Sequence, residues 1–181
     1  GLLRESLKSL KRAHAIVFTR CDQVNECEIE KIENKLNRIN TELIFSRTIH
    51  SVVNIISIDN KTSEIEQLKG EKVFAFCGIG NPKAFFTTIN TLGADITGTL
   101  IYDDHHHYTK TCIADIYEKA LQSQAKIILT THKDSTKIKS LIPEKTNIPL
   151  AYTAIEIKFT SGEDKLRNLI ELQLSGTILK K

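Results

Sequence analysis

The sequence predicts an α/β protein with a largely parallel sheet flanked by helices. Two observations lead to this fold class. Short apolar runs alternate along the chain with segments whose apolar residues recur at spacings of three and four, as expected where strands alternate with helices. The 181 residues are 40% hydrophobic and 26% charged, an ordinary balance for a globular chain that is long enough to bury a core.

The first part of the chain predicts a helix, a strand and a second helix. Leucines recur at helical spacing near the start, at Leu3, Leu7 and Leu10. The apolar run at 15–19 predicts a buried strand. A second helical face follows, formed by Ile29, Ile32, Leu36 and Ile39. Residues 43–59 are rich in β-branched side chains, which favours extended structure, and the polar stretch 60–70 is the best candidate for a boundary.

After residue 70 the alternation becomes regular. The run at 72–77 predicts a strand, and the helix after it has an apolar face formed by Phe85, Ile89 and Leu92. Residues 95–102 predict the next strand, and Thr109 could cap a helix with an apolar face formed by Ile113, Ile116 and Ala120. The remaining expected elements are a strand at 126–130 with a short helix, a strand at 150–159 and a helix at 163–174.

Charge and cysteine content exclude several classes of protein. A formal net charge of +3 with scattered lysines does not indicate a nucleic-acid partner. The four cysteines show no CxxC pairing, which fits a reducing cytoplasm, and Cys77 lies in an apolar run as a buried free thiol would. No stretch approaches 18 apolar residues, so no membrane span is expected, and the first residues lack the apolar core of a signal peptide.

Three polar clusters each follow a predicted strand at its carboxyl end, where open parallel sheets bind ligands. The first is Gly78-Ile79-Gly80-Asn81-Pro82. Gly78 and Gly80 allow backbone N–H groups to turn toward an anion, and the following helix presents its positive end there. When the segment is taken alone, a tight turn without a ligand is the simpler explanation, because glycine is the ordinary residue at such turns.

The second cluster is Asp103-Asp104-His105-His106-His107-Tyr108, for which three interpretations compete. One imidazole could transfer protons while a neighbouring carboxylate fixes its tautomer. A metal site would need ligands that converge from different elements, which consecutive residues do not readily provide. A solvated polar loop is the simplest alternative.

The third cluster is Thr130-Thr131-His132-Lys133-Asp134. Lys133, directly after a strand, is a suitable point charge for phosphate, or it forms a surface pair with Asp134. We expect Asp134 to cap the helix that follows.

Together these clusters resemble one known family, the tetraacyldisaccharide 4'-kinases. GLLRESLKSLKRAHAIVFTRCD is similar to the family's Gly-x-Leu-Arg-Glu stretch and the strand that ends in Thr-Arg-x-Asp. FCGIGNPKAFF, YDDHHHYT and LTTHKDSTKI resemble its Gly-Ile-Gly-Asn-Pro, Asp-His-His-x-Tyr-Thr and Thr-Thr-x-Lys-Asp segments, in the family order. The resemblance extends from residue 1 to about residue 159.

The resemblance implies the C-terminal part of a two-domain P-loop kinase. Such enzymes transfer the γ-phosphate of ATP, with Mg²⁺, to the 4'-hydroxyl of a lipid A disaccharide precursor at the cytoplasmic face of the inner membrane. It further implies a remnant of the N-terminal kinase domain at residues 1–41, an extended two-stranded linker region at 42–70 and a C-terminal α/β domain at 71–181.

The resemblance also implies roles for particular residues. His105, with His106 as the alternate, would act on the attacking hydroxyl together with an aspartate outside this chain, and Asp104 precedes it directly. Position at the strand ends, more than the resemblance, suggests where nucleotide or substrate would bind: at Gly78, Gly80, Asn81 and Lys133.

The sequence departs from the family pattern in three respects. No GxxxxGK[ST] motif occurs, so we expect the phosphate loop, most of the ATP and Mg²⁺ contacts and the membrane-associating segment to lie upstream, and the chain alone to be inactive. Asp103 stands where Pro is common, and His132 where Glu is common. Two alternatives remain: an α/β module that binds a nucleotide or a partner without catalysis, and a metal-dependent phosphoesterase of the Asp-His-His type.

Overall fold

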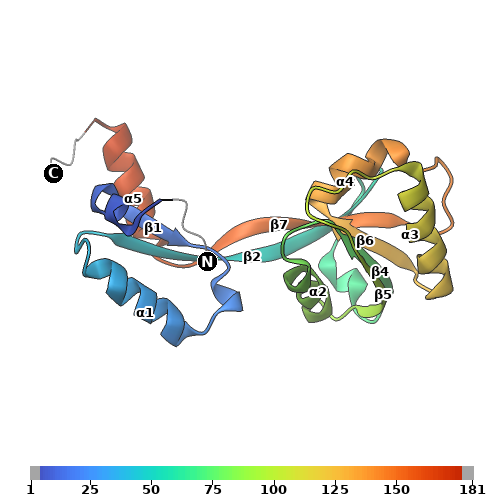
Figure 1. The fold of residues 1–181 in the computed structure, drawn as a ribbon, viewed down its shortest axis with the longest axis horizontal. Helices are drawn as coiled ribbons and strands as arrows, with labels where there is room; N and C mark the ends of the chain where they lie inside the picture. Colours follow the sequence, from blue (N-terminus) through green and yellow to red (C-terminus); the bar gives the residue numbers. More distant parts are fainter. Residues whose placement is uncertain (1–4, 177–181) are drawn as a thin grey trace. The chain divides into compact units, whose positions relative to one another are not determined.

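The fold is that of a computed structural model, which describes residues 5–176 (Figure 1). Its strands are β1 Ala15–Phe18, β2 Ile44–Ser57, β3 Thr62–Ser63, β4 Lys72–Cys77, β5 Asp95–Ile101, β6 Ile127–Thr131 and β7 Leu150–Ser161. Its α-helices are α1 Glu26–Asn37, α2 Pro82–Thr91, α3 Lys110–Gln122, α4 His132–Ile138 and α5 Glu163–Leu174. Short 3-10 helices lie at Leu7–Arg12, Cys21–Gln23, Ile65–Leu68 and Lys139–Leu141.

The strands form one mostly parallel sheet with the order β1-β2-β7-β6-β4-β5. The pairs β1/β2, β7/β6, β6/β4 and β4/β5 are parallel, whereas the short β3 pairs with β2 in the antiparallel direction. The predicted fold class, a largely parallel sheet flanked by helices, is therefore confirmed. Within residues 5–176, every helix is too short or too polar to span a lipid bilayer.

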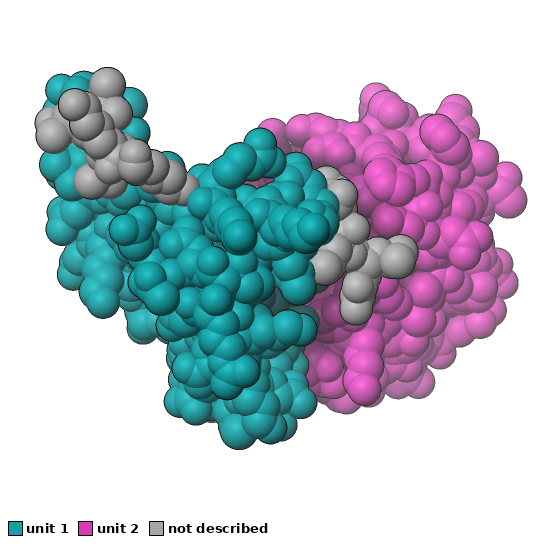
Figure 2. Space-filling model, turned by 60° about the vertical axis from the view of Figure 1, so that its left-hand side comes forward, with its two compact units in different colours: residues 1–51, 157–181 teal, residues 52–156 magenta. Residues whose placement is uncertain are grey.

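The chain divides into two compact units, coloured separately in Figure 2. One unit contains residues 1–51 and 157–181, and the other contains residues 52–156. The first holds β1, α1 and α5, and the second holds β4, β5, β6 and helices α2 to α4. The division into domains at residues 41 and 70 stays a prediction.

The core of the unit at 52–156 is built around the central strand β4. Successive side chains of a strand point to opposite faces, and β4 is buried along nearly all of its length. Val73 and Ala75 belong to an apolar cluster that includes Phe85 and Ile89 of α2. Phe74 and Phe76 belong to the other apolar cluster, together with residues of α3 such as Ile113 and Ile116. Helices α2 and α3 thus cover opposite faces of the sheet (Figure 1).

Local signals in the sequence set most element boundaries. Pro82 is the first residue of α2, and the Asn81 side chain caps this helix by accepting a hydrogen bond from the Ala84 N–H at 3.2 Å. The expected Thr109 cap of α3 is confirmed, since its side chain accepts from the Cys112 N–H. The leucine repeat at the start forms a 3-10 helix over Leu7–Arg12, and Leu3 lies outside the described residues.

Candidate active site

The polar clusters that follow β4, β5 and β6 lie together in the unit at 52–156. Strand β4 pairs in parallel with both β5 and β6, so the three strands end at the same edge of the sheet. The loops that follow them are therefore neighbours, as the position of the clusters in the sequence predicts. Two side-chain contacts join them: Lys133 Nζ lies 2.8 Å from Asp104 Oδ1, and the Gly78 N–H donates to Asp134 Oδ2 at 2.9 Å.

The two glycines after β4 allow this close approach. A Cβ atom on Gly78 would lie 3.0 Å from the Tyr108 hydroxyl oxygen and 3.2 Å from the Asp103 carbonyl oxygen, so any side chain would push the neighbouring loop away. A Cβ on Gly80 would lie in ordinary contact, 3.6 Å from Asp104 Oδ2. Gly78 is therefore required for packing, whereas Gly80 faces the carboxylate beside it.

Asp104 is held by charge and by the backbone. Its Oδ1 accepts from Lys133 Nζ and, at 3.0 Å, from the His105 N–H. The Lys133 ammonium group is the main cause that lowers the pKa of Asp104. The carboxylate is therefore ionised at neutral pH, and its Oδ2 lies 3.8 Å from His105 Nε2.

His105 is the exposed histidine beside this carboxylate. Its side chain is 79% exposed, which leaves the imidazole open to a reactant. Its backbone is in the left-handed region, with φ of 64°, a conformation that costs a residue with a Cβ about 1–3 kcal/mol. The hydrogen bond from the His105 N–H to Asp104 Oδ1 helps to hold the turn in this shape.

His106 has a different environment. Its ring stacks on Tyr102 at 4.4 Å and meets Tyr108 edge-on at 4.9 Å. Its Nε2 lies 3.5 Å from Cys112 Sγ, and hydrogen bonds to His106 first and then to Thr109 lower the pKa of this thiol to about 7. This thiol–imidazole contact was not predicted from the sequence. The one signal for it is a cysteine in the first turn of a helix that follows a histidine-rich loop.

Asp134 does not cap α4, contrary to the sequence-based expectation. β6 extends to Thr131, which is the cap: its hydroxyl oxygen accepts from the Asp134 N–H at 3.1 Å. Asp134 consequently falls in the first turn of the helix and is fully buried. Its proximity to Gly78 was missed, although the spacing Thr-x-x-Asp at a helix start is a recognisable signal for an acidic side chain that turns back toward the cap.

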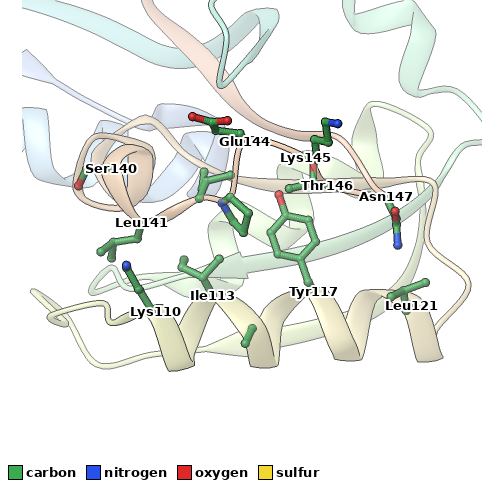
Figure 3. A pocket seen from close by; sticks show the side chains of 13 residues that line it. Lys110, Ile113, Tyr117, Leu121, Ser140, Leu141, Glu144, Lys145, Thr146 and Asn147 are labelled. Carbon is green, nitrogen blue, oxygen red and sulfur yellow. The ribbon is translucent and has the colours of Figure 1, made fainter.

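A separate pocket of about 570 Å³ lies between α3 and residues 140–147 (Figure 3). Ile113 and Tyr117 line it from α3, and Leu141 lines it from the 3-10 helix Lys139–Leu141. None of the predicted catalytic or binding residues is among those that line it. Within residues 5–176, no group of three or more His, Cys, Asp or Glu side chains is arranged to hold a metal ion.

Comparison with known proteins identifies the family. The family description "Tetraacyldisaccharide-1-P 4'-kinase" matches residues 1–175. The tetraacyldisaccharide 4'-kinase of Halothermothrix orenii is 32% identical over 175 residues, which cover 88% of this chain and 46% of that protein. The enzyme of the same name from Syntrophus aciditrophicus is 30% identical over 184 residues, which cover 97% of this chain and 48% of that protein.

A solved structure shows the same fold. LpxK from Aquifex aeolicus, in complex with ATP, matches with a TM-score of 0.58 at 23% identity, covering 93% of this chain and 45% of that one. The chain thus spans about half the length of the curated relatives that it matches. Since the family match covers nearly all of its residues, the chain belongs to the tetraacyldisaccharide 4'-kinase family.

Proposed function

We propose that this chain is the C-terminal part of an ATP-dependent kinase that phosphorylates the 4'-hydroxyl of a lipid A disaccharide precursor. Family membership over residues 1–175 and relatives that carry this enzyme's name support the proposal. The structural observation that carries it is the group of Asp104, His105 and Lys133, which comes from the loop after β5 and the first turn of α4 and lies at one edge of the sheet. It combines an accessible imidazole, an ionised carboxylate and an ammonium group.

Phosphoryl transfer depends on positioning and on stabilising charge rather than on covalent chemistry by the protein. In the proposed mechanism, the His105 imidazole accepts the proton of the attacking 4'-hydroxyl, together with an aspartate of the other half of the kinase. Asp104 stabilises the imidazolium that forms. Lys133 uses one N–H to hold Asp104 and has two further N–H groups to offer to phosphate oxygens.

His105 is a better candidate for this role than His106. The His105 ring is exposed and lies beside an ionised carboxylate. The His106 ring is packed between two tyrosines and shares its Nε2 with the Cys112 thiol. A ring held in this way is less free to approach a substrate hydroxyl.

ATP would contact the residues after β4 and Lys133 with its phosphate groups. Gly78, Gly80 and Asn81 form the turn into α2 and shape the edge beside Asp104. The described residues do not fit Mg²⁺, because no set of three potential ligands converges and Lys133 already neutralises Asp104. We therefore assign Mg²⁺ to the part of the kinase outside this chain. We propose that most of the ATP contacts and the attachment to the cytoplasmic face of the inner membrane also belong to that part.

Replacing His105 with alanine in the full-length kinase tests the proposal. We expect kcat to fall about 10²–10⁴-fold, the usual effect of losing a positioned acid–base group. ATP affinity and the melting temperature should change little, because the side chain is exposed. Steady-state kinetics, ATP titration and thermal unfolding provide the three measurements.

His107→Ala is the matched control, since His107 is an exposed histidine of the same loop. We expect near wild-type turnover for it. Equal losses at both positions would show that the loop is needed only as a whole, and full activity of His105→Ala would remove His105 from the mechanism.

A further inference from the structure

A buried carboxylate lies beneath the proposed active site. Asp134 is 0% exposed. Its Oδ2 accepts two hydrogen bonds, from the Gly78 N–H at 2.9 Å and from the Thr131 hydroxyl at 2.7 Å. A buried carboxylate is costly unless hydrogen bonds and an opposite charge compensate it, so its surroundings must hold a defined geometry.

The other oxygen of Asp134 faces the loop that follows β5. Oδ1 lies 3.9 Å from Lys137 Nζ, and a Cβ on Gly78 would lie 3.3 Å from this oxygen and 3.0 Å from the Tyr108 hydroxyl oxygen. Asp134 and Tyr108 therefore flank Gly78 from two sides. Burial, followed by the negative charge of Asp134, raises the pKa of Tyr108 far above its ordinary value.

Lys137 extends this contact to the histidine-rich segment. Its Nζ donates to the His106 carbonyl oxygen at 3.4 Å and lies 5.9 Å from the centre of the Tyr108 ring. The group around Asp134 thus joins three segments: Gly78 after β4, His106 and Tyr108 after β5, and the end of β6 with α4, which supply Thr131 and Lys137.

We propose that Asp134 is a positioning residue for phosphoryl transfer. It fixes the Gly78 backbone directly, and through Lys137 and Tyr108 it fixes the loop that presents Asp104 and His105. Being fully buried, Asp134 acts through these neighbours and touches no reactant. The catalytic consequence of this proposal rests on the proposed kinase function. The structural link from Asp134 to Gly78 does not depend on that function.

The first experiment measures that link in the 181-residue chain. Amide hydrogen exchange at Gly78, followed by NMR, reports whether its N–H is bonded. In folded Asp134→Ala we expect exchange at least about tenfold faster, because the acceptor is gone. Asp134→Asn should retain slow exchange, since its amide oxygen can replace Oδ2. Asp115→Asn, which alters an exposed ion pair on α3, is the matched control. Unchanged exchange in folded Asp134→Ala would overturn the proposal.

The second experiment measures kcat and the KM for ATP in the full-length kinase, well below the melting temperature of each variant. Asp134→Ala should lower kcat about 100-fold, the effect of a misplacement of about 1 Å, while the KM for ATP changes much less, because most of the proposed ATP contacts lie outside this chain. Asp134→Asn should recover a large part of the loss. A purely structural role would lower only the melting temperature, and wild-type kcat in folded Asp134→Ala would overturn the proposal.

A further variant decides the matter if Asp134→Ala does not fold. Lys137 is partly exposed, so Lys137→Gln should fold and lose the bridge that the ammonium group makes from Asp134 to the His106 carbonyl oxygen and the Tyr108 ring. We expect kcat to fall about tenfold, because a smaller displacement of the loop still misplaces the imidazole. Wild-type kcat in this variant would overturn the proposal. If the wild-type full-length protein does not phosphorylate the lipid precursor, the proposed function falls, and exchange at Gly78 still decides whether Asp134 holds the loop.

Discussion

At the scale of single residues, the Lys133 ammonium group pairs with Asp104 and can also bind a phosphate group. We expect Lys133→Ala in the full-length kinase to lower kcat/KM at least about tenfold, a loss of about 1.4 kcal/mol of transition-state stabilisation. The melting temperature should change little, because both partners of the ion pair are more than two-fifths exposed. Kinetics and thermal unfolding check this together.

Lys119→Ala is the matched control for Lys133, because it removes an exposed ion pair of similar length, 2.7 Å, on α3. Equal kinetics for Lys133→Ala, Lys119→Ala and the wild type would reduce Lys133 to a surface residue.

Cys112 carries a second prediction at this scale. The thiolate is the reactive form, and the pKa of Cys112 is lowered to about 7, so the rate of alkylation by iodoacetamide should rise with pH and reach half of its maximum near pH 7. Cys77, whose pKa burial raises to about 11, should stay unmodified in the folded chain. Timed labelling followed by peptide mass spectrometry measures both rates.

His106→Ala removes the main cause of the lowered pKa of Cys112. The midpoint of its alkylation should then move up toward the ordinary thiol value of about 8.5. An unchanged pH profile in this variant would refute the assigned thiol–imidazole contact.

At the scale of the elements, the junction between β7 and α5 depends on one glycine. Gly162 has φ of +73°, and a Cβ there would lie 2.2 Å from the Phe45 carbonyl oxygen of β2. Its own carbonyl oxygen accepts from the Ser46 hydroxyl at 2.8 Å. We expect Gly162→Ala to lower the free energy of unfolding by about 2–4 kcal/mol, because the clash adds to the strained backbone. Urea unfolding measures the change.

The control for this junction is Gly70→Ala. Gly70 has a similar φ of +76°, but no atom lies within 4 Å of the added Cβ, so only the backbone cost of about 1 kcal/mol should appear. Equal losses at both positions would contradict the proposed clash with Phe45.

Element types were predictable where the pattern is local. The strand at 72–77 and the helix at 163–174 match β4 and α5 to the residue, because apolar alternation and helical spacing are short-range properties. The expected cap of α4, Asp134, was wrong, because Thr131 and Asp134 are both suitable near a helix start. The β6 ladder, which pairs Thr131 with Thr153 of β7, decided between them.

At the scale of the whole molecule, the chain spans about half of its relatives and contains no GxxxxGK[ST] motif. We expect the isolated 181 residues to fold, as judged by circular dichroism, and to transfer no phosphate from ATP to a lipid A precursor. The full-length kinase, assayed in parallel, is the positive control. A rate for the chain close to that of the full-length enzyme would show that the phosphate-binding residues lie within these 181 residues.

The sequence alone determined the fold class, the order of strands and helices along the chain, the positions of the three polar clusters at strand ends, and the family. These properties depend on local spacing and on short motifs. Only the tertiary structure decided which side chains meet. Lys133 and Asp104 are 29 positions apart, and Gly78 and Asp134 are 56 positions apart. Such contacts depend on how strands pair and how helices pack against them, which residue spacing along one segment does not encode.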